Sequence, residues 1–209
     1  MSNNVINCDW RSLAKRPYTL YLSEEVIKRC LILAFNSNSL IAECANEFYG
    51  VRGDNVVFDE LSEMCIESDP GAGNKDASVH SCNVLDNPIA YERFSKFWKK
   101  AKSESCLLDI HTHMYGMLND GVVYEDYWKF SSGDIEVYKK SAEILAGKDV
   151  EFFGGIVYLH QNGNCGLSIV NYDLSSDELY HVDKVYVVNY ETRATRPLSN
   201  SYIGNIFNF

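Results

Sequence analysis

Residues 107–116 read LLDIHTHMYG, an apolar run that ends in two histidines one residue apart. On a β-strand, side chains two positions apart face the same side of the sheet and lie about 6.6 Å apart along the chain. His111 and His113 would therefore present both imidazoles in one direction, which suits two ligands of one metal ion. A catalytic zinc takes three protein ligands and keeps its fourth position for water, so the pair requires a third donor.

The helix expected over 131–147 (SSGDIEVYKKSAEILAG) supplies a candidate for the third donor. It begins at a serine, has an acid three residues later and ends at a glycine, which is the pattern of a capped helix. Asp134 falls in the first turn of this helix, which follows the histidine strand through a loop. Capping alone also explains Ser131 and Asp134, because the serine oxygen and the acid both stabilise a helix N-terminus. The sequence leaves both interpretations open.

An acidic residue upstream completes the constellation. Glu47 enters an expected strand in ANEFYGVRG (45–53), where Gly50 and Gly53 allow close backbone approach or a sharp turn. A carboxylate at such a position can lie over a metal ion and act on its water as a general base.

The candidate residues occur in the order typical of one enzyme family: Glu47 in an E-x-x-G context, His111-x-His113, and Ser131-x-x-Asp134. The ordered set resembles the signature of the JAMM (MPN) zinc metalloproteases. The resemblance implies Zn²⁺ bound by the two histidines and Asp134. It also implies that Glu47 binds and deprotonates the zinc water and that Ser131 steadies the oxyanion. The implied activity is that of a zinc isopeptidase that removes or processes ubiquitin-like modifiers.

One segment departs from the family pattern. Residues 114–130 form a longer spacer than most family members use, and Met114 stands where most have a proline. A surface loop can lengthen at modest entropic cost. The aromatic residues of the spacer either form a lid or substrate-gripping patch over the cleft, or simply pack onto the domain: Tyr115, Tyr124, Tyr127, Trp128 and Phe130.

Strands and helices are expected to alternate around these motifs. Strands are predicted at 18–22, in a hairpin over 47–61, and at 106–110, 153–159, 166–172 and 180–190. Helices are predicted from Ser23, over 88–102 and over 131–147. The order predicts an α/β (α+β) sandwich of the JAMM/MPN-like (cytidine deaminase-like) type, with a mixed, mostly antiparallel sheet flanked by helices. We expect one domain over 18–209 after an N-terminal extension over 1–17.

The composition excludes several classes of partner. Lys and Arg total 19 against 29 for Asp and Glu, and the net charge of −10 disfavours nucleic acid. No apolar run approaches the ~20 residues that span a bilayer, so no membrane is expected. The 7 cysteines form no C-x-x-C pair, which favours reduced thiols and a cytoplasmic location. The expected partner is a ubiquitin-like protein or peptide substrate, and the sequence does not indicate an oligomeric state.

Two alternatives remain for the same residues. D-x-H-x-H also resembles the opening of the metal-dependent amidohydrolase barrels, but a (β/α)₈ barrel needs ~250 residues and this chain has 209. A noncatalytic scaffold or ubiquitin-like binding module of the same fold would lack at least one functional residue, and none is missing here, which favours an enzyme. His80 and Cys82 are either a second metal half-site or structural residues.

Overall fold

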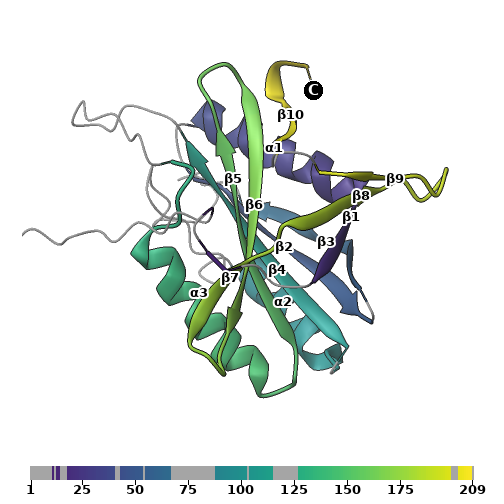
Figure 1. The fold of residues 1–209 in the computed structure, drawn as a ribbon, viewed down its shortest axis with the longest axis vertical. Helices are drawn as coiled ribbons and strands as arrows, with labels where there is room; N and C mark the ends of the chain where they lie inside the picture. The colour runs from purple at the N-terminus through teal and green to yellow at the C-terminus, as the bar shows by residue number, and fades with distance from the viewer. Residues whose placement is uncertain are drawn as a thin grey trace, which may run out of the picture.

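The computed structural model describes a subset of the chain, namely residues 11, 13–14, 18–40, 43–53, 55–66, 88–102, 104–114, 127–198 and 202–208. Within these residues a single sheet curls around helix α1, and α3 lies against its other face (Figure 1). The architecture is mixed α/β, as the alternation of strands and helices in the sequence predicted.

The helices are α1 (Glu24–Leu40), α2 (Pro88–Lys100) and α3 (Ser132–Ala146), with a short 3-10 turn, η4 (Ile206–Asn208). The strands are β1 (Thr19–Ser23), β2 (Ala45–Arg52), β3 (Val56–Ile66), β4 (Ser105–Met114), β5 (Glu151–Leu159), β6 (Asn164–Asp173), β7 (Glu178–His181), β8 (Lys184–Val188), β9 (Thr195–Pro197) and β10 (Tyr202–Asn205). The sheet order is β10-β6-β5-β4-β2-β3-β1-β8-β9, with β7 paired to β6. Strand β1 is parallel to β3 and β8, and β4 is parallel to β5, whereas the other pairs are antiparallel.

Helix α1 begins where the sequence predicted and runs through the segment whose end the sequence left open. Its N-terminus is capped by Ser23, whose Oγ accepts from Val26 N at 3.2 Å. The helix then continues past the polar cluster 36–39. Ser37 within that cluster is buried, and its Oγ accepts from Thr112 Oγ1 at 2.8 Å. This tertiary contact supports helical structure where local propensity favours a turn.

Two hydrophobic cores cover the two faces of the sheet. The first lies between the sheet and α1 and includes Leu108 and Ile110 of β4. The second lies under α3, with part of α2, and includes Leu107 of the same strand. Since successive side chains of a strand alternate between faces, His111 and His113 point to the α3 side. The alternation of β4 thus places the histidine pair beneath the N-terminal part of α3.

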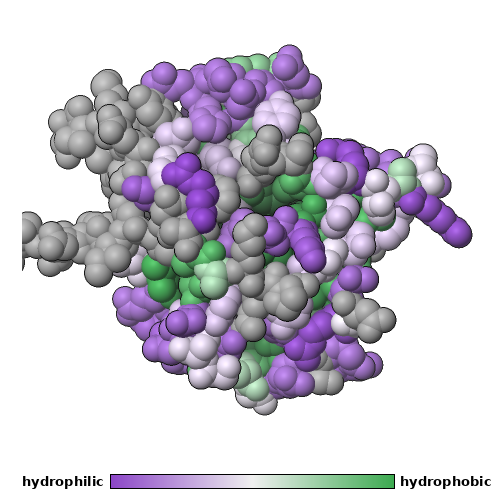
Figure 2. All heavy atoms as spheres, viewed as in Figure 1, coloured by the Kyte–Doolittle hydropathy of each residue, from purple (hydrophilic) through white to green (hydrophobic). Residues whose placement is uncertain are grey.

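The C-terminal third differs from the sequence prediction in one respect. The prediction of a single strand over 180–190 is wrong. The segment instead contains the end of β7 and all of β8, which are separated near Val182. Strand β7 pairs with β6, whereas β8 pairs with β1 at the other end of the sheet. The turn after β8 projects from the body of the molecule, and residues 190–197 are exposed there (Figure 2). Such a change of partner strand is decided by tertiary pairing.

Four residues that the sequence analysis named lie outside the described residues, namely His80, Cys82, Tyr115 and Tyr124. None of the described helices combines the length and apolar character needed to cross a membrane. All three described residues of the expected N-terminal extension contact the rest of the chain, and Leu13 packs against the core under α3. The Arg11 guanidinium lies 3.7 Å from the centre of the Trp128 ring, and the Ala14 carbonyl accepts from His181 N at 2.9 Å.

Candidate metal centre

Three side chains converge where β4 ends beneath the first turn of α3. His111 Nε2 lies 2.9 Å from His113 Nε2 and 3.2 Å from Asp134 Oδ1. His113 Nε2 lies 3.4 Å from Asp134 Oδ2. Such a group of two imidazoles and a carboxylate can hold a metal ion, and no comparable group of His, Cys, Asp or Glu occurs elsewhere in the described part of the chain.

The separations between these donors fit one small cation. Two ligand atoms that each lie ~2.1 Å from a zinc ion, at the tetrahedral angle, are ~3.4 Å apart. The three observed separations of 2.9, 3.2 and 3.4 Å are close to this value. A structural zinc site uses four protein ligands, so a metal ion held by these three donors would have at least one position for another ligand.

Helix α3 delivers the carboxylate through its own N-terminal cap. Ser131 N donates to Asp134 Oδ2 at 2.6 Å, and Asp134 N donates to Ser131 Oγ at 3.1 Å, forming a capping box. The same carboxylate reaches both histidines. The two interpretations of Ser131 and Asp134 are therefore compatible, because the cap fixes the direction in which the candidate ligand points.

Hydrogen bonds on the far side of each imidazole orient the pair. His113 Nδ1 lies 3.0 Å from the Tyr127 carbonyl oxygen, which can only accept, so Nδ1 donates there and Nε2 is the ring nitrogen that faces His111 and Asp134. Tyr138 Oη donates to the Gly155 carbonyl at 3.2 Å and lies 3.5 Å from His111 Nδ1. A Cβ at Gly154 would overlap the Tyr138 ring, so glycine is required there. Such outer contacts fix the tautomer and orientation of metal ligands.

The electrostatics of the cluster keep the carboxylate ionised. Burial by itself raises the pKa of Asp134, but the charge of His111 and hydrogen bonds from both histidines outweigh it and lower the pKa. Burial lowers the pKa of His111, and the Asp134 charge more than offsets this, so the pKa is raised. The negative charge of Asp134 therefore favours a positive charge beside it. A bound cation would supply that charge in place of a proton.

A further acid, Glu43, lies two residues before β2 and interacts electrostatically with the cluster. Ala45 of β2 pairs with His111, and Thr112 N donates to the Cys44 carbonyl at 2.8 Å, so the antiparallel register carries Glu43 opposite His113. Burial raises the pKa of Glu43 to about 8, with a lowering effect from His113 and a raising effect from Asp134. Glu43 is therefore within electrostatic reach of two of the candidate ligands.

The structure does not bring Glu47 into this group. Glu47 pairs with Asp109, two residues before His111, and accepts from Tyr49 Oη at 2.9 Å. Burial, followed by the Asp109 charge, raises the pKa of Glu47 to about 7. Burial likewise raises the pKa of Asp109 to about 6, and its buried Oδ1 has no hydrogen-bond partner among the described residues. The two acids form a buried pair beside the cluster.

Sequence reasoning missed Glu43 because Glu43 and Glu47 lie four residues apart and face the same side of the sheet. It assigned no role to His160, whose Nδ1 lies 2.6 Å from Tyr127 Oη. Among the spacer aromatics, Phe130 is fully buried in the core under α3, and Tyr127 and Trp128 pack against it, as the packing alternative predicted.

No protein-family model matches the chain, and no curated protein matches it significantly.

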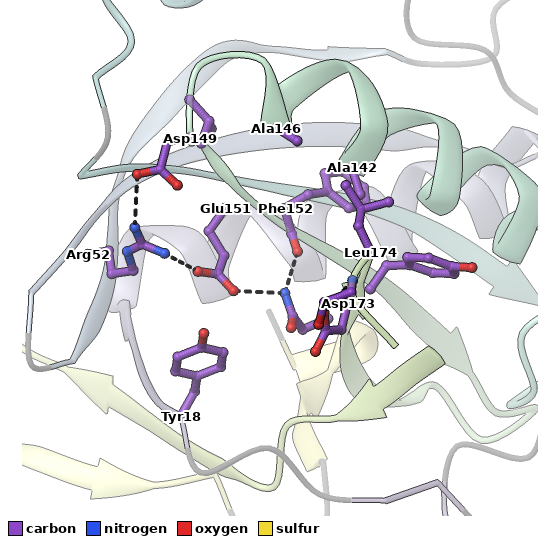
Figure 3. A pocket seen from close by; sticks show the side chains of 13 residues that line it. Tyr18, Arg52, Ala142, Ala146, Asp149, Glu151, Phe152, Asp173 and Leu174 are labelled. Carbon is purple, nitrogen blue, oxygen red and sulfur yellow. Dashed lines mark hydrogen bonds and ion pairs between the residues drawn. The ribbon is translucent and has the colours of Figure 1, made fainter. Parts of the chain in front are cut away.

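A separate cavity of about 390 Å³ lies at the opposite end of the same strands (Figure 3). Three of its charged residues bind one another: Arg52 Nη1 lies 2.5 Å from Glu151 Oε2, and Arg52 Nη2 lies 3.8 Å from Asp149 Oδ2. Asn171 Nδ2 donates to Glu151 Oε1 at 3.2 Å. These polar contacts form a structural network that connects β2 with β5 and β6.

Proposed function

We propose that this chain is a zinc-dependent hydrolase of amide bonds, of the JAMM (MPN) type. The observation that carries the proposal is the convergence of His111, His113 and Asp134 at ligand–ligand separations that suit one tetrahedral ion. The mixed α/β sheet with helices on both faces, and the delivery of Asp134 from a capped helix after the histidine strand, support the family assignment. Two nitrogen donors and one carboxylate form a donor set that zinc accepts in catalytic sites.

A zinc ion held by these three side chains would lower the pKa of water from 15.7 to ~7 and polarise a carbonyl group. Glu43 supplies the proton transfer. Its carboxylate accepts a proton from the attacking water and returns the proton to the leaving amine. We assign this role to Glu43 rather than Glu47 because Glu43 lies opposite His113, whereas Glu47 pairs with Asp109. A nearby cation also lowers the pKa of Glu43, so the carboxylate is available near neutral pH.

Ser131 is assigned to the oxyanion. Its Oγ accepts from Asp134 N, which leaves the hydroxyl proton available for another acceptor. A single donor aimed at a developing oxyanion contributes about 3 kcal/mol to the transition state. Placement at the N-cap fixes Ser131 relative to Asp134, and hence relative to the reacting carbonyl.

The proposed substrate is a peptide or isopeptide bond at the tail of a ubiquitin-like protein. The family resemblance carries this part, and the net charge of −10 is complementary to a basic modifier surface. The histidine strand β4 lies between β2 and β5, so a substrate tail cannot add to it as a further strand. The tail instead crosses the face of the sheet that carries the histidines.

The test combines metal analysis with turnover. The purified full chain is expected to contain about one zinc per molecule and to release a fluorophore from a ubiquitin-like protein carrying a C-terminal amide-linked reporter. A chelator should abolish the activity and added zinc should restore it. Zinc bound without hydrolysis of any amide reporter would support the noncatalytic scaffold instead. Failure to bind zinc in wild-type protein would remove the basis of the proposal.

A further inference from the structure

A cavity of about 210 Å³ lies on the β5–β6–β10 side of the metal centre. It is bounded by Tyr158 of β5, by His160 in the turn that follows, by Asn164 and Gly166 of β6, and by Tyr202 of β10. Tyr158 and Tyr202 both pair with Gly166, from opposite sides. Two tyrosines thus flank a strand position that has no side chain.

The cavity opens on the face of the sheet that carries the candidate ligands. Tyr158 is the β5 partner of His113, and residues paired across neighbouring strands project to the same face. Gly166 is the β6 partner of Tyr158 and so lies in the same row. A Cβ at Gly166 would overlap the Tyr158 ring, so this glycine allows the ring to lie flat over β6.

One residue, Tyr127, connects the cavity wall to the metal centre. Its carbonyl accepts from His113 Nδ1 at 3.0 Å, and its hydroxyl lies 2.6 Å from His160 Nδ1. Its ring centre lies 5.3 Å from that of His160 and 6.5 Å from that of Tyr158. The cavity and the candidate ligands are therefore separated by a single layer of side chains.

The lining determines which chemical group the cavity would accept. Among the described residues it consists of two tyrosines, an imidazole, two asparagines, a buried cysteine and a glycine, with no Lys, Arg, Asp or Glu. A charged group entering such a site would lose hydration without gaining an opposite charge. An uncharged aliphatic or aromatic side chain gains contact with the tyrosine rings at no such cost.

We propose that this cavity is the subsite for an uncharged side chain of the amide substrate, two to four residues from the scissile bond. The inference rests on the proposed hydrolase function. The spacing follows from the sheet, because two strand-to-strand steps separate β4 from β6, about 10 Å in total, and an extended peptide covers about 3.3 Å per residue. The subsite thus sets the substrate preference some three residues from the reacting carbonyl.

The experiment introduces a negative charge into the cavity and reads out binding. The background is the zinc-loaded full chain with Glu43→Gln, so that bound peptides are not cut. Fluorescein-labelled tail peptides that differ only in Leu or Arg, at each of the four positions before the scissile bond, are titrated by anisotropy. The parent should prefer Leu at one position. Adding Tyr202→Glu should shift the Leu/Arg ratio of Kd values toward Arg at that position by about fivefold.

Tyr190→Glu provides the matched control. Tyr190 is 51% exposed and Tyr202 is 49% exposed, and Tyr190 lies in the projecting turn after β8, outside the cavity lining. The control should leave the Leu/Arg ratio unchanged. An unchanged ratio in Tyr202→Glu at every position, or no binding of any peptide, would overturn the subsite. If Tyr202→Glu shifts the ratio but the wild-type chain cleaves no amide, the hydrolase function is overturned and the subsite stands.

Discussion

Glu43 lies two residues before β2, and the register of the Ala45–His111 pair, extended past the end of the β2–β4 ladder, carries it opposite His113. Thr112 N holds this end of the ladder together by donating to the Cys44 carbonyl. The relationship places an acid with a raised pKa beside the imidazole of a candidate ligand. It identifies the acid best placed for proton transfer, and leaves Glu47 in a buried pair with Asp109.

Glu43→Gln should reduce kcat/KM by about 10²- to 10⁴-fold with bound zinc retained, because an amide cannot accept the proton of the attacking water. Glu47→Gln is the matched control, since it is the same substitution four residues further along the chain, within β2. It should reduce kcat/KM by less than tenfold. Steady-state kinetics and zinc content of both variants check this, and a larger loss in Glu47→Gln would return the catalytic role to Glu47.

Removal of Asp134 should separate its two tasks. Asp134→Asn should lose most of the stabilisation that zinc gives the wild-type chain, which is about 2.7 kcal/mol at a free zinc concentration one hundred times Kd. Ser131→Ala removes the cap oxygen but no candidate ligand. It should lower the free energy of unfolding by about 1 kcal/mol with or without zinc. Urea unfolding of both variants, with zinc and with chelator, measures these differences. Equal zinc stabilisation of Asp134→Asn and wild type would exclude Asp134 as a ligand.

Tyr127→Phe removes the hydroxyl that contacts His160 and keeps the carbonyl that holds His113. Because outer contacts orient metal ligands, zinc affinity should fall by about tenfold. Tyr180→Phe is the control, since it removes a hydroxyl that donates to Glu178 at 2.9 Å, in β7. Competition with a fluorescent zinc chelator gives the affinities. An unchanged affinity in Tyr127→Phe would show that the backbone carbonyl alone suffices to orient His113.

The buried acid pair should make the metal-free protein less stable as pH rises. Burial raises the pKa of Asp109 to about 6 and that of Glu47 to about 7, above the ordinary values of 3.8 and 4.5. The folded state thus binds more protons than the unfolded state between about pH 4 and pH 7. Stability is then fully present below this window and falls through it, by at most about 1.4 kcal/mol per pH unit for each group.

Glu47→Gln should flatten this pH dependence and stabilise the chelated protein above pH 7, whereas Glu178→Gln at the exposed start of β7 should not. The free energy of unfolding in urea, measured with chelator from pH 5 to pH 8, gives the slopes. If the free energy of unfolding changed with pH as steeply in Glu47→Gln as in wild type, Glu47 would have the same pKa in the folded and unfolded states.

Much of the fold was predictable from local patterns. The hydrophobic alternation and turn residues located β2 and β3, and the Ser131 cap located α3 to within a residue. Local patterns did not predict the structure of segments whose contacts are with residues far away in the sequence. Helix α1 continues through polar residues because Thr112 contacts Ser37, and the segment 180–190 divides because β7 and β8 pair with strands far apart in the sheet.

The sequence by itself determined that two imidazoles face one way on a strand and that an acid stands in the first turn of a capped helix, because both follow from the periodicity of a single element. Only the tertiary structure decided which glutamate faces the histidines. Glu43 lies two residues before β2 and Glu47 lies within it, four residues further along, so alternation alone does not separate them. The register that does is fixed by pairing between segments sixty to seventy residues apart. The same holds for His160, which contacts Tyr127 next to the site.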